Sequence, residues 1–341
     1  MSKHTVIALD LAKTVIQIAK VSKHGEIEFN KAQSPDKIRK ILANSKPCIV
    51  AMEGCGSAQY WARYAKEHGH EVRMMSPRKV KPFMTGQKND ANDAIAIAIA
   101  AQHPSMSFAP VKTLEQQSIQ SINTSRRFLD KSLTALNNHI RAIAYEYGQT
   151  IPKGMKGLRL RMAELLEPES TTLTDSVKDL LSSMWEQFKR TQTQLKNVTQ
   201  QLDGFTKAIE PCQRLQQVEG IGPKSASLLY AAIGNGKAFK NGRDASVYVG
   251  VTPRQYSSGG KPVLLGITKH GDATLRATMY QGALAVVSRL SSEPKTQKQQ
   301  WLLDLVKRAG VKRTCIALVN KNIRTAWAML KYNTEYQPVY L

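Results

Sequence analysis

Short apolar runs alternate with amphipathic stretches over the first hundred residues of this 341-residue chain. The pattern predicts five strands, at residues 5–9, 15–21, 26–30, 47–52 and 71–75. A turn at residues 22–25 joins the second strand to the third, and a helix is predicted at residues 57–68. The run at 47–52 is continuously apolar, which is typical of a strand buried on both faces.

The order of these elements indicates the fold class. Three strands come first, followed by a helix, a strand, a helix, a strand and then more helices. This is the order of an α/β domain of the ribonuclease H type. A dinucleotide-binding fold is disfavoured because no Gly-x-Gly-x-x-Gly follows the first strand.

From residue 112 to 209 the apolar residues recur every seven positions. The repeat comprises Ile122, Leu129, Leu136 and Ile143, and later Leu181, Phe188, Leu195, Leu202 and Ile209. Repeats of this length predict a coiled coil or a long helical hairpin, with residues 148–157 as the connection. The alternative is an ordinary bundle of core helices, which the polar seam residues Arg126 and Thr191 leave open.

The third segment is mostly helical and opens with Gly220-Ile-Gly222 before a predicted helix. Such glycines let backbone N–H groups approach a phosphate at a helix N-terminus, so Gly220, Gly222 and Lys224 predict a helix-hairpin-helix-like contact. A tight structural turn is the alternative. We predict segments 1–108 (α/β), 109–210 (coiled helices), 211–332 (helical) and a tail, 333–341, with a continuous helix joining the second segment to the third.

Composition adds a class of partner to this picture. The chain carries 49 Lys and Arg against 26 Asp and Glu, a formal net charge of +23. This excess favours a polyanion, since each phosphate that the protein neutralises releases counterions. No apolar run approaches twenty residues, and the four Cys form no C-x-x-C pair. We therefore expect a cytoplasmic nucleic-acid-binding protein with no membrane span, zinc ribbon or disulfide framework.

Four carboxylates lie at the ends of predicted elements: Asp10, Glu53, Asp90 and Asp93. Asp10 and Glu53 end the first and fourth strands, while the two others follow a predicted helix start near residue 89. Converging carboxylates suit two Mg²⁺ ions that act on a phosphodiester. Taken singly, Asp90 could be a helix N-cap, Asp93 a partner of the helix dipole, and Glu53 part of a strand-end turn.

A glycine-rich loop at residues 253–261 holds two adjacent serines, Ser257 and Ser258, between Arg254 and Lys261. An exposed hydroxyl bordered by cations is suited to attack phosphorus, because the cations stabilise the developing negative charge. The alternative is a solvent loop that binds phosphate without chemistry. The residues of the loop alone leave both interpretations open.

Six motifs occur in one order along the chain: Ala8–Lys13, Met52–Gly56, Lys88–Ala94, Glu219–Ala226, Val251–Lys261 and Gly266–Arg276. Together they resemble the insertion-sequence transposases of family one-ten. The Ser-Ser-Gly-Gly-Lys stretch at 257–261 is most similar to their eleven-eleven subgroup. The resemblance covers nearly the whole chain, although the second segment matches only in pattern.

The resemblance implies a RuvC-like domain with an Asp-Glu-Asp-Asp metal site, a coiled-coil arm and a C-terminal transposase domain. It places the nucleophile at Ser258 rather than Ser257 and adds Lys269 and Arg276 to the candidate nucleic-acid contacts. It also implies a structured non-coding bridge RNA that pairs with target and donor DNA, and homodimers that assemble into tetramers.

The leading hypothesis is an RNA-guided DNA recombinase that moves its own insertion sequence through Ser258 and Mg²⁺, and that is nucleoid-associated when active. The first alternative is a structure-selective endonuclease of the Holliday-junction type, in which water attacks the phosphate. The second is a nucleic-acid-binding scaffold without activity, which the intact acidic set disfavours.

Overall fold

The computed structural model describes residues 4–257, 259–261 and 263–341. These residues form two compact units. The first comprises the described residues up to Gln116 together with Ala232–Lys240, and the second comprises Gln117–Ala231 and Asn241–Leu341. The division into sequence segments 1–108, 109–210 and 211–332 stays a prediction.

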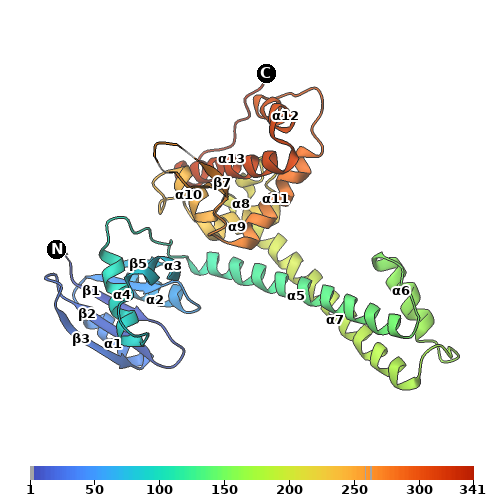
Figure 1. The fold of residues 1–341 in the computed structure, drawn as a ribbon, viewed down its shortest axis with the longest axis horizontal. Helices are drawn as coiled ribbons and strands as arrows, with labels where there is room; N and C mark the ends of the chain where they lie inside the picture. Colours follow the sequence, from blue (N-terminus) through green and yellow to red (C-terminus); the bar gives the residue numbers. More distant parts are fainter. Residues whose placement is uncertain (1–3, 258, 262) are drawn as a thin grey trace. The chain divides into compact units, whose positions relative to one another are not determined.

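A five-stranded sheet forms the centre of the first unit (Figure 1). Its strands are β1 (Val6–Asp10), β2 (Ile16–Val21), β3 (Ile27–Gln33), β4 (Ile49–Glu53) and β5 (Glu71–Met75). The spatial order is β3-β2-β1-β4-β5, in which β1, β2 and β3 pair antiparallel and β1, β4 and β5 pair parallel. The predicted α/β domain with a central sheet is confirmed, and its strand order is compatible with a ribonuclease H type fold.

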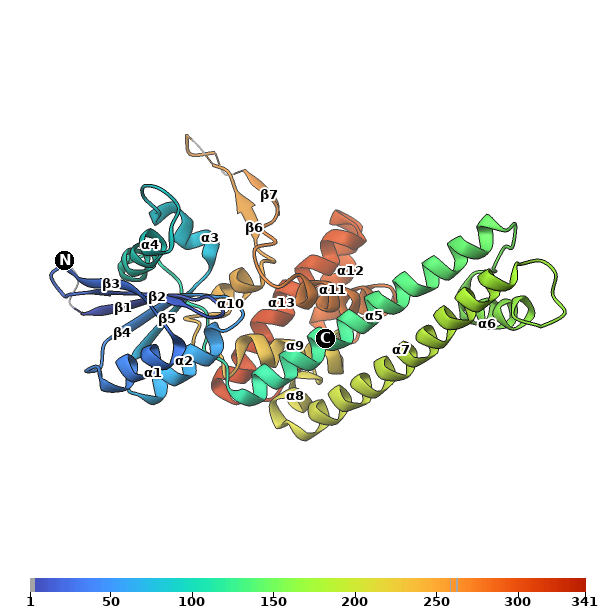
Figure 2. The same cartoon turned by 90° about the horizontal axis from the view of Figure 1, so that it is seen from below.

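Helices cover both faces of this sheet (Figure 2). Helices α1 (Pro35–Asn44) and α2 (Ala58–Glu67) pack on one face, and α4 (Asp90–Gln102) packs on the other. Alternate residues of β1 serve the two cores, because successive side chains of a strand point to opposite faces. Helix α3 (Pro77–Val80) and the short helix η1 (Lys81–Phe83) lead from β5 towards α4.

Three helices form an arm: α5 (Leu114–Glu146), which belongs to the second unit from Gln117 onward, α6 (Gly154–Leu165) and α7 (Asp175–Ala208). The sequence predicted a connection or hairpin tip at residues 148–157; the residues before Gly154 do connect α5 to α6, but α6 already begins at Gly154. The helix forms because Leu158, Met162 and Leu165 recur at helical spacing and are buried against α5 and α7. A supercoiled coiled coil within the arm stays a prediction.

The expected continuous helix between the second and third segments is wrong. Helix α7 ends at Ala208, Ile209 is extended (φ −97°, ψ 109°), and α8 (Glu210–Leu215) starts afresh. Pro211 accounts for the break because its ring clashes with the carbonyl four residues earlier and it has no N–H to donate.

The remaining elements surround α13 (Val311–Tyr332), which packs against α10 (Gly242–Val249), α11 (Ala273–Val287) and α12 (Gln297–Ala309). Helix α9 (Pro223–Ile233) follows the predicted Gly220-Ile-Gly222 turn. Two short strands, β6 (Pro253–Gln255) and β7 (Leu264–Ile267), form a hairpin. Within the described part of the chain, no helix is long and apolar enough to cross a membrane.

Candidate active site

The strand order places two of the predicted carboxylates at one edge of the sheet. Strands β1 and β4 are parallel neighbours, with Leu9 opposite Met52. Asp10 and Glu53 are the next residues and end these strands. Both are half-buried. The carboxyl ends of adjacent parallel strands therefore meet where the sequence predicted them to meet.

The start of α4 brings two further carboxylates to this edge. Asn89 is the N-cap of α4, and its side chain accepts a hydrogen bond from the N–H of Asn92 at 2.8 Å. Asp90 and Asp93 then lie in the first turn. Asp90 is therefore not the N-cap, which removes one of the alternative interpretations of this residue.

Two amides hold the first turn of α4 over the sheet. Gln17 of β2 lies opposite Asp10, and its Nε2 donates to Asn30 Oδ1 at 2.7 Å. Asn30 Nδ2 in turn donates to the carbonyl of Ala91 at 2.9 Å. Neither residue was predicted from the sequence, because the pairing depends on the register of β2 and β3 and has no local signal.

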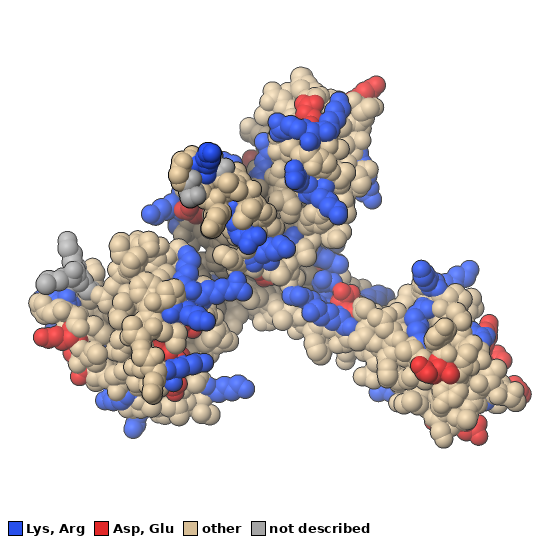
Figure 3. Space-filling view, in the orientation of Figure 1, with Lys and Arg blue, Asp and Glu red and all other residues tan. Residues whose placement is uncertain are grey.

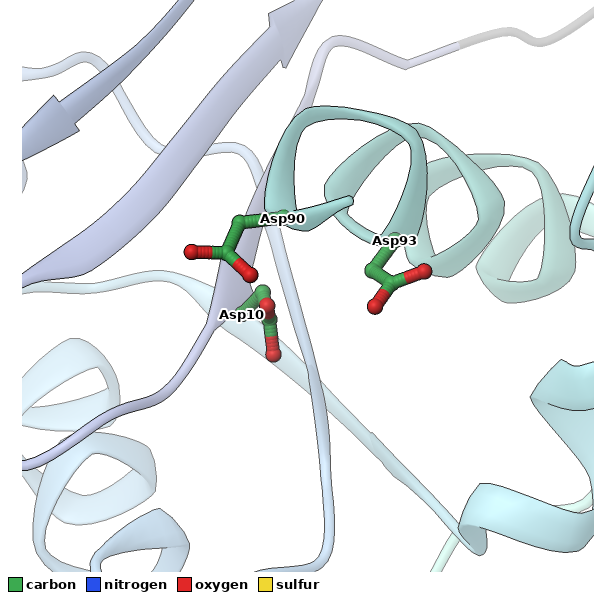
Figure 4. Close-up of side chains that lie close together, drawn as sticks. All are labelled: Asp10, Asp90 and Asp93. Atoms are coloured by element: carbon green, nitrogen blue, oxygen red, sulfur yellow. The ribbon is translucent and has the colours of Figure 1, made fainter. Parts of the chain in front are cut away.

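Three carboxylates converge in the structure: Asp10, Asp90 and Asp93. One oxygen of each lies within 4.8 Å of the others (Figure 4). Asp10 comes from the end of β1, and the other two come from the same turn of α4. Glu53 lies outside this group of three, although its charge interacts with the charges of Asp10 and Asp93.

Burial, and to a lesser extent neighbouring negative charge, raises two pKa values at this edge. Burial raises the pKa of Asp10 above its ordinary value, and the charges of Asp93 and Asp90 raise it further. Burial likewise raises the pKa of Glu53, with added contributions from Asp10 and Asp93. No salt bridge among the described residues involves these carboxylates. The site therefore concentrates negative charge that a cation would neutralise.

The donor set fits a hard divalent cation. All its ligand atoms are carboxylate oxygens, which Mg²⁺ prefers over nitrogen and sulfur. Asp93 Oδ1 is buried and has no hydrogen-bond partner among the described residues. A buried, unpaired carboxylate oxygen is costly unless a ligand satisfies it, so this atom supports a cation at the site.

The first residues of the predicted glycine-rich loop, Pro253–Gln255, form strand β6 of a hairpin with β7, an element that the sequence did not predict. Ser258 lies outside the described residues, so its assignment as nucleophile stays a prediction. The neighbouring Ser257 Oγ accepts hydrogen bonds from Gln255 Nε2 at 3.0 Å and from the N–H of Val263 at 3.2 Å. The Ser257 hydroxyl therefore helps to hold the two strands together.

The backbone approaches itself closely at Gly250 and Gly271, at the base of this hairpin. Gly250 has φ +80°, and a Cβ atom there would lie 2.7 Å from the nitrogen atoms of His270 and Gly271. A Cβ atom at Gly271 would lie 2.2 Å from the carbonyl oxygen of Tyr248. Arg276 Nη1 donates to the carbonyls of Val249 and Gly271 at 3.0 and 2.6 Å. Arg276, predicted to contact nucleic acid, thus braces the hairpin base in this structure.

The other predicted nucleic-acid contacts differ in exposure. Lys224, Arg254, Lys261 and Lys269 are exposed, as is Gly222. Gly220 has φ +88° and packs closely on α11, where a Cβ atom at Gly282 would lie 2.1 Å from the Gly220 carbonyl oxygen. This contact explains the glycine at position 220 by packing, without a phosphate contact. Lys and Arg dominate the visible charged surface around α12 and α13 (Figure 3).

Comparisons with known proteins find transposases along nearly the whole chain. A family described as "Transposase", named for the DEDD transposase of IS110, matches residues 2–148. The IS116/IS110/IS902 transposase family matches residues 212–299. The chain is 37% identical to a probable family 20 transposase of Pseudomonas aeruginosa over 97% of this chain and 98% of that protein. The identity is 36% to the transposase for insertion sequence element IS1111A of Coxiella burnetii (97% and 91%) and 33% to that for IS1328 of Yersinia enterocolitica (98% and 99%).

Proposed function

Because the chain belongs to the IS116/IS110/IS902 family of transposases, we propose that it moves an insertion sequence with a serine nucleophile and a metal-binding carboxylate site. The family and its DEDD-type domain make the protein an enzyme that cleaves DNA and transfers strands. The proposal goes further in assigning the nucleophile to Ser258 and the cation to Mg²⁺. The carboxylate ligands are those predicted from the sequence: Asp10, Glu53, Asp90 and Asp93.

The observation that carries the metal assignment is the convergence of three carboxylates within 4.8 Å, one of them with a buried oxygen that no described residue hydrogen-bonds. Divalent cations at such sites stabilise the attacking and leaving oxygens of a phosphodiester. Asp10, Asp90 and Asp93 would be the inner ligands, because their oxygens are closest together. Glu53 would then orient or complete the set from the adjacent strand.

In the first chemical step, Ser258 Oγ attacks the DNA phosphorus. The new Oγ–P bond replaces one bridging P–O bond, the serine proton leaves, and the departing DNA hydroxyl takes up a proton. In the second step a hydroxyl of the other DNA strand loses its proton and attacks the phosphorus of the phosphoserine; the Oγ–P bond breaks, and Oγ takes up a proton to restore the serine. Strands are thus exchanged with no net change in the number of phosphodiester bonds.

A guide RNA and a homo-oligomer belong to the same proposal. A structured bridge RNA pairs with target and donor DNA, so that base pairing reads sequence while the protein contacts backbone and shape. The net charge of +23 supports simultaneous binding of RNA and DNA. Homodimers that assemble into tetramers would supply two sets of nucleophiles for the strands that are exchanged.

Two variants test the proposal in a strand-exchange assay with copurified RNA. Ser258→Ala should abolish exchange and retain DNA binding, because it removes the nucleophile alone. Asp10→Asn should abolish the activity that Mg²⁺ restores after chelation. A full exchange rate in Ser258→Ala, or unchanged turnover in chelator, would overturn the corresponding assignment.

A further inference from the structure

One face of the β6–β7 hairpin is apolar and exposed. Tyr256 N–H donates to the carbonyl of Val263 at 2.9 Å, which sets these residues opposite each other. Val263 and Leu265 are two positions apart, so their side chains share a face. Tyr256 is 76% exposed, and Val263 and Leu265 are each 47% exposed. Among the described residues, one aromatic and two aliphatic side chains therefore share an exposed face, while Leu264, 66% exposed, points to the opposite face.

The charge around this face fits a polyanion. Between Asp244 and Asp272 the sequence contains Arg254, Lys261 and Lys269 but no Asp or Glu. All three cations are exposed. An exposed apolar face in a segment whose Lys and Arg residues are not offset by any Asp or Glu combines the two features of single-strand binding surfaces, which are stacking platforms and positive charge for the backbone.

The hairpin holds this face at a defined place. Its base is fixed by the close approach of Gly250 to Gly271, and Lys269 N–H donates to the Gly250 carbonyl at 3.0 Å. Tyr256 precedes Ser258 by two positions. Two residues span at most about 7 Å, or about two nucleotide steps, so the ring can reach a base next to a phosphate bound at residue 258.

We infer that Tyr256, supported by Val263 and Leu265, stacks on an unpaired DNA base beside the phosphate that is cleaved. The inference rests on the proposed function, because it places the ring relative to the cleaved phosphate. The face takes an unstacked base because every base offers an apolar ring, so the contact needs no particular sequence. Tyr256 then positions the strand, while residue 258 performs the chemistry.

Photocrosslinking tests the contact independently of serine chemistry. The DNA spans the junctions of the insertion sequence and carries 5-iodouracil at single positions around the mapped cleavage site. The protein is the full chain with Ser258→Ala and its copurified RNA. We expect a crosslink to Tyr256 within about two nucleotides of the cleavage site. Tyr256→Phe should keep it, because 5-iodouracil crosslinks to aromatic rings, and Tyr256→Ala should lose it.

Kinetics supply the second measurement. In the otherwise wild-type chain, Tyr256→Ala should slow strand exchange about 5- to 150-fold, the range of stacking on one base, and Tyr256→Phe should retain it. An abasic nucleotide at the crosslinked position should slow the wild type and have little further effect on Tyr256→Ala. Tyr340→Ala is the matched control, because Tyr340 is 69% exposed on the C-terminal tail.

Three results would overturn the inference. The crosslink could map outside residues 253–267, or Tyr256→Ala could exchange strands at the wild-type rate. Tyr256→Ala could also split the oligomer while DNA crosslinks are absent from Tyr256, which would assign the face to protein–protein contact. If Ser258→Ala remains active while the Tyr256 crosslink is present, the serine assignment fails and the stacking contact stands.

Discussion

Replacing Asp10 with Asn should stabilise the metal-free protein while removing its activity. Asp10 lies within 4.8 Å of both Asp90 and Asp93, and its pKa is raised by burial and by these charges. Asn keeps nearly the same volume and removes one negative charge. The remaining carboxylates then repel one another less in the folded state.

The magnitude follows from Coulomb's law. The carboxylate oxygens lie within 4.8 Å of one another. At that upper limit, two unit charges repel by about 0.9 kcal/mol at the dielectric constant of water and about 3.5 kcal/mol at an effective value of 20. Asp90 is exposed and Asp93 is half-buried, so solvent screens much of this repulsion. We expect Asp10→Asn to raise the free energy of unfolding by about 1–3 kcal/mol, and each kcal/mol should raise the Tm by about 2–5 °C.

The pH dependence has a definite sign. A raised folded-state pKa means that ionising Asp10 costs folding free energy, so the wild type loses stability as pH rises from about 3.9, the unfolded value, through the folded value. The advantage of Asp10→Asn should therefore develop over this interval and vanish at lower pH, where Asp10 is protonated in both states.

Thermal unfolding with and without Mg²⁺ checks this prediction. Saturating Mg²⁺ should raise the Tm of the wild type, because Mg²⁺ at 100 times its Kd adds about 2.7 kcal/mol to the free energy of unfolding. The rise in Tm should be much smaller for Asp10→Asn. Asp130→Asn on α5 is the control, since Asp130 is exposed and outside the carboxylate group. The reasoning is refuted if metal-free Asp10→Asn melts below the wild type, or if Mg²⁺ stabilises both proteins equally.

Three further variants probe the residues that position the carboxylate group and those that hold the β6–β7 hairpin. Asn30→Ala removes the hydrogen bonds from Gln17 and to Ala91. It should lower the free energy of chemical unfolding by about 1–3 kcal/mol and weaken Mg²⁺ binding. Unchanged Mg²⁺ affinity would contradict a role of Asn30 in positioning α4. Ser257→Ala loses the two hydrogen bonds that its hydroxyl accepts, so it should slow strand exchange yet leave it measurable, whereas complete loss would point to Ser257 as the nucleophile. Gly271→Ala places a Cβ atom 2.2 Å from a carbonyl oxygen, while a Cβ atom at Gly266, on the same hairpin, meets no atom within 4 Å. Gly271→Ala alone should abolish strand exchange. Wild-type exchange rates in both variants would show that the close approach at Gly271 is unimportant.

The carboxylate edge was predictable because its residues are tied to strand ends. Asp10 ends an apolar run, and parallel pairing of β1 with β4 then brings Glu53 beside it. The pattern could not show that Asp10, Asp90 and Asp93 form one close group while Glu53 lies outside it, because this depends on how α4 sits on the sheet. That placement is set in part by the amide of Asn30, whose contact with Ala91 joins residues 61 positions apart.

Exposed strands, and a helix that begins after a proline and a glycine, were harder to predict. Strands β6 and β7 have exposed side chains on both faces, so they lack the alternation that marks a half-buried strand. Helix α6 follows Pro152 and begins at Gly154, residues that normally signal a turn. Its buried residues Leu158, Met162 and Leu165 hold the helical period that could have identified it.

The central claim is that strand exchange passes through a covalent bond between residue 258 and DNA. The direct measurement is to stop the reaction during turnover, digest the protein and DNA, and identify the modified peptide by mass spectrometry. We predict a nucleotide linked through phosphate to Ser258, formed only with a divalent cation and absent from Asp10→Asn. Cleaved DNA without any protein adduct would contradict the account and identify a structure-selective endonuclease in which water attacks.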